Sequence, residues 1–161
     1  MKLNFKKFGE GKPLIILHGL FGSLDNWQTL GKVLAEKYTV YLVDLRNHGK
    51  SPHSDTFSYL DMVNDVAELI EDEKLETVSL IGHSMGGKTT MTFAAEYPQY
   101  LEKLIVVDIA PKKYAPHHQE IIDALYSLDL TKIKSRREAD EVMKEKIAVD
   151  GTRLFLLKNL N

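Results

Sequence analysis

Hydrophobic residues alternate along the chain between short apolar runs and segments in which they recur at helical spacing. The apolar runs predict strands at residues 3–8, 14–17, 38–43, 78–81 and 104–107, and we expect the runs 14–17, 78–81 and 104–107 to be buried. The segments between them predict helices at residues 27–34, 59–70 and 86–97, the first capped by Asp25 or Asn26. Strands that alternate with helices are typical of a mostly parallel sheet flanked by helices.

The last third of the chain has a different pattern. No strand is predicted beyond Pro111, and apolar residues recur at helical spacing over 121–128 and 155–160. Ser135 and Glu138 have the spacing of a capping box and predict a helix that starts there. Gly151 is expected to separate that helix from the last one. We therefore predict an α/β part over residues 1–112 and an all-helical part over 113–161.

Composition and charge narrow the class of protein. Of the 161 residues, 43% are hydrophobic and 27% are charged, and the net charge of −2 gives no electrostatic reason to expect nucleic acid as a partner. No apolar stretch approaches the ~18 residues of a membrane span, and the first residues lack the apolar core of a secretory signal. The chain contains no cysteine, which excludes disulfides and thiolate catalysis within it. These features predict a cytoplasmic domain with no membrane partner.

A serine motif lies between a predicted strand and a predicted helix. Gly82-His-Ser-Met-Gly86 matches the pattern G-x-S-x-G, in which a nucleophilic serine projects from a sharp turn and larger residues in place of the glycines would collide with it. The helix that follows points its N-terminus at the same spot, so the backbone N–H of Met85 is placed to help hold an oxyanion. The motif predicts Ser84 as a catalytic nucleophile.

The same residues also match a phosphate-binding pattern. Gly82 to Thr89 fits G-x-x-x-x-G-K-[ST], the P-loop of nucleotide-binding proteins, again between a strand and a helix. Two observations argue against it. A P-loop normally follows the first strand of its sheet, whereas three predicted strands precede Gly82. It also leaves unexplained His18-Gly-Leu-Phe-Gly22, at the end of a strand where an acyl-transfer enzyme places its second oxyanion donor.

Taken together, four segments resemble the α/β-hydrolase family, and within it small bacterial carboxylesterases of the YbfF type. The segments are His18-Gly-Leu-Phe-Gly-Ser-Leu-Asp-Asn26, Asp44-Leu-Arg-Asn-His-Gly49, Gly82-His-Ser-Met-Gly-Gly-Lys88 and Asp108-Ile-Ala-Pro111. The resemblance implies an α/β-hydrolase-type core over 1–112 and the beginning of a helical cap over 113–161. The cap itself is expected to start near His117. The final strands of that fold are absent from this chain.

The resemblance also implies roles for individual residues. Ser84 is the expected nucleophile, and the backbone N–H groups of Leu20 and Met85 form the expected oxyanion hole. Asp108, at the end of the strand that follows the nucleophile helix, is expected to be the acid of the triad. Phe21 is a candidate for lining the acyl pocket. The expected reaction is hydrolysis of a small acyl ester through an acyl-enzyme, and it needs no cofactor and no metal.

Besides the less favoured P-loop nucleotide binder, two other functions remain open at this point. The same apparatus would act on thioesters such as acyl-CoA, because the serine motif does not distinguish leaving groups. A non-catalytic binding protein on a hydrolase scaffold is the alternative from another class. His18, His48 and Asp44 are expected to shape the loops around the site rather than to react, and Tyr114 is a weaker candidate for reaching it.

A catalytic histidine is not apparent. In the family this base follows the last strand, and none of the six histidines of this chain follows a late strand. His83 is next to Ser84 but should point to the opposite side, and His117 and His118 are poor substitutes. We therefore expect residues 1–161 to be the N-terminal portion of a longer enzyme, with its C-terminal part as the natural partner. Without a base, the serine should lose on the order of 10⁶ in kcat.

Overall fold

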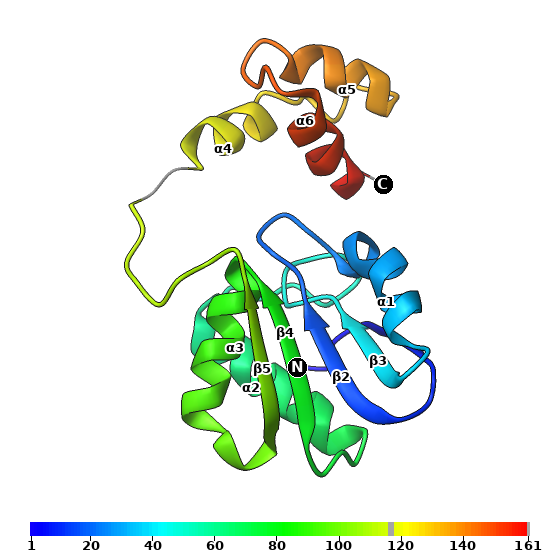
Figure 1. The fold of residues 1–161 in the computed structure, drawn as a ribbon. Helices are drawn as coiled ribbons and strands as arrows, with labels where there is room; N and C mark the ends of the chain where they lie inside the picture. The colour runs from blue at the N-terminus through cyan, green and yellow to red at the C-terminus, as the bar shows by residue number, and fades with distance from the viewer. Residues whose placement is uncertain (116–117, 161) are drawn as a thin grey trace. The chain divides into compact units, whose positions relative to one another are not determined.

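The computed structural model describes residues 1–115 and 118–160 of the chain. They form two compact units, Met1–Pro111 and Lys112–Asn161, and each is described by itself. The first unit contains every strand of the described residues, and the second contains only helices (Figure 1). The boundary falls where the sequence pattern changes from strands to helices. The roles of hydrolase core and cap remain predictions.

The first unit is built on a five-stranded sheet with the order β1-β3-β2-β4-β5. Its strands are β1 (Phe5–Phe8), β2 (Lys12–Leu17), β3 (Tyr38–Val43), β4 (Val78–His83) and β5 (Leu101–Val107). β1 runs antiparallel to β3, and the other neighbours are parallel. The mostly parallel sheet predicted from the alternation of elements is confirmed.

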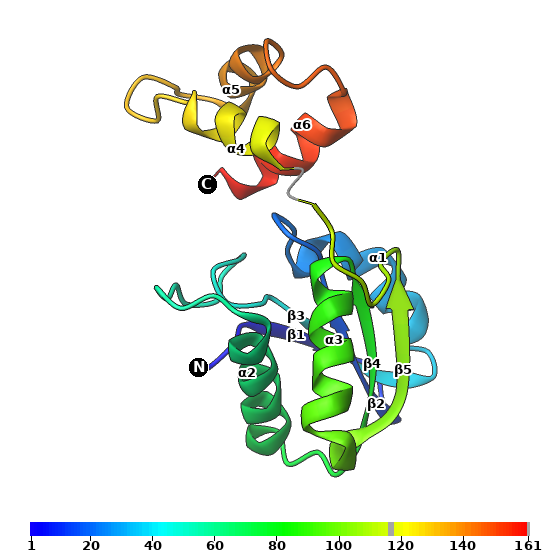
Figure 2. The same cartoon turned by 90° about the vertical axis from the view of Figure 1, so that its left-hand side faces the viewer.

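Helices cover both faces of this sheet (Figure 2). Two of them, α2 (Tyr59–Asp72) and α3 (Met85–Glu96), lie on one face, and α1 (Gln28–Leu34) lies on the other. Two short 3-10 helices complete the unit, η1 (Leu24–Trp27) before α1 and η2 (Pro98–Tyr100) before β5.

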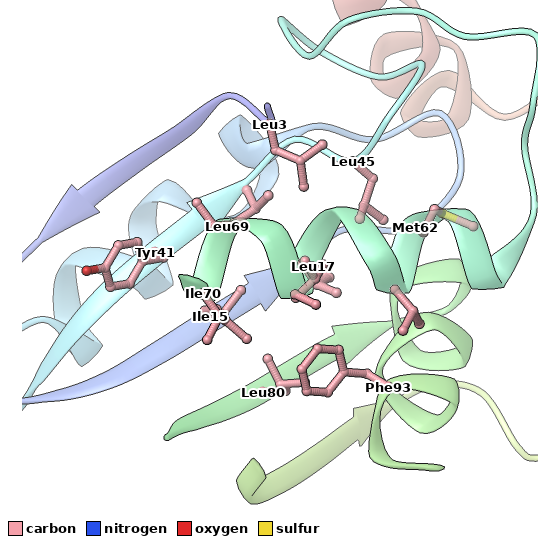
Figure 3. Close-up of a cluster of buried hydrophobic side chains, with 14 of the residues drawn as sticks. Leu3, Ile15, Leu17, Tyr41, Leu45, Met62, Leu69, Ile70, Leu80 and Phe93 are labelled. Atoms are coloured by element: carbon pink, nitrogen blue, oxygen red, sulfur yellow. The ribbon is translucent and has the colours of Figure 1, made fainter. Parts of the chain in front are cut away.

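The two cores follow from the alternation of side chains along the strands. In β2, Ile15 and Leu17 face α2 and α3, whereas Leu14 and Ile16 face η1 and α1. Figure 3 shows the larger cluster, in which α2 lies across side chains contributed by several strands. Because the last four residues of β2, Leu14 to Leu17, are all buried, they appear in the sequence as one unbroken apolar run.

The second unit consists of α4 (Gln119–Tyr126), α5 (Arg136–Met143), α6 (Asp150–Leu156) and the 3-10 helix η3 (Leu157–Asn159). The predicted start of α5 is confirmed, since the Ser135 hydroxyl accepts the Glu138 N–H at 3.2 Å. The Glu138 carboxylate accepts the N–H of Lys134 at 2.9 Å. Among the described residues, none of the helices has the length and apolar character needed to cross a bilayer.

Three expectations about these elements were wrong. The first helical segment is capped by Ser23 rather than Asp25 or Asn26, and the Asn26 side chain instead accepts the Ser23 N–H at 2.7 Å. Gly151 lies inside α6, because Asp150 already starts that helix. The run 104–107 is not buried, since β5 is the edge strand and Ile105 is 49% exposed.

A buried ion pair ties the segment after β3 to α2. The Arg46 guanidinium donates to the Asp65 carboxylate at 2.6 and 2.9 Å, and it also donates to the Thr56 carbonyl at 3.0 Å. Asp65 is 1% exposed and also accepts the amino group of Met1 at 2.6 Å. Removing one member of such a pair leaves a buried charge without its main partner.

We predict that Arg46→Met lowers the free energy of unfolding by about 3–5 kcal/mol, because Asp65 keeps its charge but loses the guanidinium. Urea denaturation measures this change. The matched control is Lys12→Met, which removes the ion pair of the exposed Lys12 with Glu102 and should leave the denaturation midpoint unchanged. Equal denaturation midpoints for the two variants would show that the buried Arg46–Asp65 ion pair does not stabilise the fold more than an exposed one.

Candidate active site

Ser84 stands on a strained turn between β4 and α3. β4 ends at His83 and α3 begins at Met85, so Ser84 is the one residue between them. Its φ of 51° lies in the left-handed region, which costs free energy for any residue other than glycine. The Ser84 N–H donates to the Val107 carbonyl at 3.1 Å, which places the turn against the end of β5. The strand–turn–helix context predicted for the serine motif is therefore present.

The two flanking glycines are required by the close approach of backbone atoms. A Cβ on Gly82 would lie 2.3 Å from the carbonyl oxygen of Gly86. A Cβ on Gly86 would lie 2.5 Å from the carbonyl oxygen of Leu17, at the end of β2. Both distances are far below any real carbon–oxygen contact. The glycine spacing of the motif thus lets the start of α3 pack on the ends of β4 and β2.

The segment after β2 turns beside Ser84. The Gly22 N–H donates to the Gly19 carbonyl at 3.0 Å, and Phe21 has a φ of 60°. A Cβ on Gly19 would lie 3.3 Å from the Cβ of Ser84, so this segment passes directly by the serine. We refer to residues 19–22 as the oxyanion turn, after the role that the sequence predicts for the Leu20 N–H.

Among the backbone N–H groups near Ser84, two that the sequence predicts as oxyanion donors have no protein acceptor within residues 1–115 and 118–160. They belong to Leu20, in the oxyanion turn, and to Met85, the first residue of α3. The Gly86 N–H donates to the His18 carbonyl at 3.1 Å, which holds the two segments together. This part of the structure brings Ser84, Leu20 and Met85 to one place.

His18 and His48 are buried and bind backbone groups with both ring nitrogens. The Nδ1–H of His18 donates to the Gly19 carbonyl at 2.8 Å, and its Nε2 accepts the Leu45 N–H at 3.0 Å. The Nε2 of His48 accepts the Phe21 N–H at 3.2 Å, and its Nδ1–H donates to the Arg46 carbonyl at 2.9 Å. Since each Nε2 accepts an N–H, both rings are neutral and carry their proton on Nδ1.

Burial is the main cause of a lowered pKa in both rings. It lowers the pKa of His18 to about 4 and also lowers the pKa of His48. The two rings lie 5.1 Å apart, so a positive charge on one would also disfavour a charge on the other. These contacts agree with the expectation that His18 and His48 shape loops.

Asp44 connects the oxyanion turn to the segment after β3. Its carboxylate accepts the Leu24 N–H at 2.7 Å and the Lys50 N–H at 2.9 Å. The Asn4 side-chain amide donates to it at 2.8 Å. Gly49 passes so close to this carboxylate that any Cβ would lie 2.2 Å from its carbon. Asp44 is therefore buried, and both of its carboxylate oxygens accept hydrogen bonds that hold two loops together.

Asp108 lies at the carboxyl end of β5, next to the serine turn. In the pairing of β4 with β5, His83 is opposite Val107, so Ser84 and Asp108 are the next residues of the two strands. Asp108 has a φ of 56°, and its side chain is 86% exposed. The His83 ring lies near it, with Nε2 at 3.8 Å from a carboxylate oxygen. No local pattern predicts this contact, because strand alternation places His83 and Ser84 on opposite sides.

The phosphate-binding interpretation does not fit the backbone. A P-loop offers its N–H groups to phosphate, but here the Gly86 N–H donates to His18 and the Lys88 N–H donates to Ser84. The Lys88 ammonium lies 5.9 Å from the centre of the Tyr59 ring.

The remaining candidates are less informative. Phe21 is half-buried within the oxyanion turn. Tyr114 belongs to the second unit, and Lys112 lies 5.1 Å over its ring. His117 lies outside the described residues. Within the described ranges, no cluster of three or more metal-ligating side chains is present.

Comparison with known proteins gives one consistent family. Residues 12–141 match the family described as the alpha/beta hydrolase fold. The chain is 34% identical to esterase YbfF of Escherichia coli over 165 residues, covering 99% of this chain and 65% of that protein. It is 39% identical to the sn-1-specific diacylglycerol lipase ABHD11 of Xenopus laevis, covering 93% of this chain and 51% of the lipase.

A solved structure agrees with these sequences. A marine microorganism esterase superimposes with a TM-score of 0.97 at 48% identity, covering 99% of this chain and 64% of that one. The chain therefore spans between about half and two thirds of the length of the relatives that it matches.

We predict that the folded chain loses stability as the pH falls from about 6.5 to about 4. Unfolding exposes His18, whose pKa then rises from about 4 to its ordinary value of 6.5, so the unfolded chain binds protons more strongly in this window. The free energy of unfolding should be highest above pH 6.5, decrease by up to about 3 kcal/mol towards pH 4, and level off below it.

Urea denaturation at a series of pH values measures this dependence. His18→Asn, which cannot titrate, should be less stable at pH 7 but should show a flatter pH dependence between 6.5 and 4. Parallel curves for the two proteins would show that the proton on His18 is not responsible.

Proposed function

The chain belongs to the α/β-hydrolase fold family, and from this premise we propose that it acts as a serine carboxylic-ester hydrolase through an acyl-enzyme. The observation that carries the proposal is the position of Ser84. It sits on a strained turn, near the backbone N–H groups of Leu20 and Met85, which have no protein acceptor in the described residues. Strain of this kind persists where the surrounding packing fixes it, and it gathers at functional sites.

In the proposed first half-reaction, the Ser84 hydroxyl oxygen attacks the ester carbonyl carbon and its proton passes to a histidine base. The carbonyl oxygen becomes an oxyanion and accepts hydrogen bonds from the Leu20 and Met85 N–H groups. The tetrahedral intermediate then collapses, and the protonated base returns its proton to the leaving alcohol. Water attacks the acyl-enzyme by the same steps and releases the acid.

Asp108 is proposed as the acid of the triad. Its place beside Ser84 at the end of β5 allows its carboxylate to hold the imidazole in the correct tautomer and to stabilise the imidazolium. We propose that the base itself lies outside residues 1–161, supplied by a C-terminal part of the same enzyme. His18 and His48 support this, because both of their ring nitrogens are already engaged by the backbone.

The proposed substrate is a small acyl ester. The relatives named above are an esterase, a diacylglycerol lipase and a marine esterase, which favours oxygen esters over thioesters. The proposed steps use protein groups alone and require neither a metal nor a cofactor. Phe21, half-buried beside the Leu20 N–H, is the proposed contact for the acyl chain.

We predict that a fluorophosphonate probe labels Ser84 in the full-length protein, because the serine is activated and the phosphonyl oxygen fits the oxyanion site. Ser84→Ala should abolish both the labelling and the turnover of short p-nitrophenyl esters. The matched control is Ser127→Ala, which removes an exposed serine of the second unit and should leave both unchanged. Labelling that survives Ser84→Ala would refute the nucleophile assignment, and so would ester turnover that survives it.

We predict that Asp108→Asn lowers kcat by about 10³–10⁴-fold, because an amide no longer favours the required tautomer or stabilises the imidazolium. Steady-state kinetics of the full-length protein with a p-nitrophenyl ester measures the change. Asp55→Asn, on an exposed loop, is the matched control and should keep kcat within a factor of about two. A loss below about tenfold for Asp108→Asn would move the acid role to another residue.

A further inference from the structure

We propose that His48 is a positioning residue, which holds the oxyanion turn in its active geometry by accepting the Phe21 N–H. The contact joins two segments far apart in the sequence, residues 19–22 after β2 and the segment after β3, with a distance of 3.2 Å between Phe21 N and His48 Nε2. The proposal rests on the proposed function, since it assigns His48 a role in preparing the oxyanion site.

The oxyanion turn has one peptide that its own hydrogen bonds leave unfixed. The Gly19 carbonyl accepts both the Gly22 N–H and the Nδ1–H of His18, which fixes the peptide between Gly19 and Leu20. The central peptide, between Leu20 and Phe21, takes part in neither bond. Its orientation decides the conformation of Phe21, and the N–H at its end is the one that His48 accepts.

The observed orientation is unfavourable for the residues present. A positive φ at the third position of a four-residue turn is the type II arrangement, and it favours glycine there. Phe21 adopts it with a φ of 60°. Rotation of the central peptide would relieve Phe21, but it would turn the Leu20 carbonyl towards His48 and break the contact. A neutral Nε2 accepts an N–H and repels a carbonyl oxygen, so His48 selects the strained form.

His48 is itself held rigidly, which suits it to this task. Its Nδ1–H donates to the Arg46 carbonyl at 2.9 Å and so keeps the lone pair on Nε2. Phe57 lies against the ring, with centroids 6.0 Å apart. The charged and titratable groups that act on the ring are Asp44, His53 and His18. Because burial lowers the pKa of His48, the ring stays neutral at and above neutral pH.

Asp44 supports the same turn from its other side. It accepts the Leu24 N–H at 2.7 Å, two residues after the turn ends. The segment after β3 therefore binds the oxyanion turn at Phe21 and the chain just after the turn at Leu24. Preorganised N–H donors stabilise an oxyanion because they need not reorient during the reaction. A turn free to exchange between two peptide orientations would lose that advantage.

Two substitutions at His48 separate this role from simple packing. His48→Gln places an amide oxygen near the position of Nε2, where it accepts the Phe21 N–H. His48→Asn reaches only the position of Nδ1, so it keeps a donor for the Arg46 carbonyl and loses the acceptor. We expect His48→Asn to lower kcat of the full-length protein about tenfold or more with little change in KM, and His48→Gln to recover most of that loss.

The control is Asp55→Asn, which changes an exposed side chain of the same loop and should leave kcat unchanged. Hydrogen exchange of the Phe21 amide, followed by NMR, reports on the contact without any need for activity. We expect this amide to be protected in the wild-type and His48→Gln proteins, and to exchange faster in His48→Asn.

The outcomes distinguish this proposal from the proposed function. Turnover that survives Ser84→Ala overturns the proposed function, whatever the amide shows. When turnover depends on Ser84, a wild-type kcat in His48→Asn overturns the positioning role. Equal losses in His48→Gln and His48→Asn also overturn it, because the effect would then follow the loss of the ring rather than the acceptor. Equal Phe21 exchange in all three proteins overturns the contact itself.

Discussion

The site depends on how closely three backbone segments approach one another at the carboxyl edge of the sheet. The end of β2, the end of β4 and the start of α3 meet where neither Gly82 nor Gly86 has space for a Cβ. The Gly86 N–H closes this junction by donating to the His18 carbonyl at 3.1 Å. Because backbone atoms rather than flexible side chains set the spacing, Ser84 and the oxyanion turn are placed with little freedom to drift. Geometry of this kind is what preorganised catalysis requires.

Around this junction, the segment after β3 works as a buried polar scaffold. Asp44, Arg46 and His48 are nearly inaccessible to solvent, and each bonds to backbone or side-chain partners outside its own turn. Burying such groups is costly unless they are paired, and within the described part of the chain every buried side-chain polar atom has a partner. Once paired, they tolerate few alternative arrangements, because each alternative would leave a buried group unsatisfied. The scaffold therefore fixes the shape of the loops around the site.

Local patterns predicted most of the elements and the serine turn, because period, glycine spacing and chain order are properties of short segments. The apolar run Leu104 to Val107 by itself predicted a buried strand, but such a run is covered only if something packs beside it, and β5 is the edge strand of the described sheet. The Ser23 cap was not predicted because Ser23, Asp25 and Asn26 are all residue types that favour the N-cap position of a helix. The contacts of His48 with Phe21 and of His83 with Asp108 join separate segments, and no local pattern reveals them. For the same reason the sequence suggested that His48 shapes a loop, without showing which one.

Backbone strain points to the same edge of the sheet as the side-chain chemistry does. Among the described residues, five other than glycine have a positive φ, and four of them lie at the carboxyl ends of strands or in the segments that follow: Phe21, Asn47, Ser84 and Asp108. Each such conformation costs of order 1–3 kcal/mol, so four together represent a substantial fraction of the stability of an ordinary domain. A scaffold that served only to bind a partner through its outer surface would have no need to hold this strain in one place. The proposed function would explain this concentration of strain, because it requires the turns to present Ser84, the Leu20 N–H and Asp108 to a single reacting group. Gly86 packs on β2 at the same edge of the sheet.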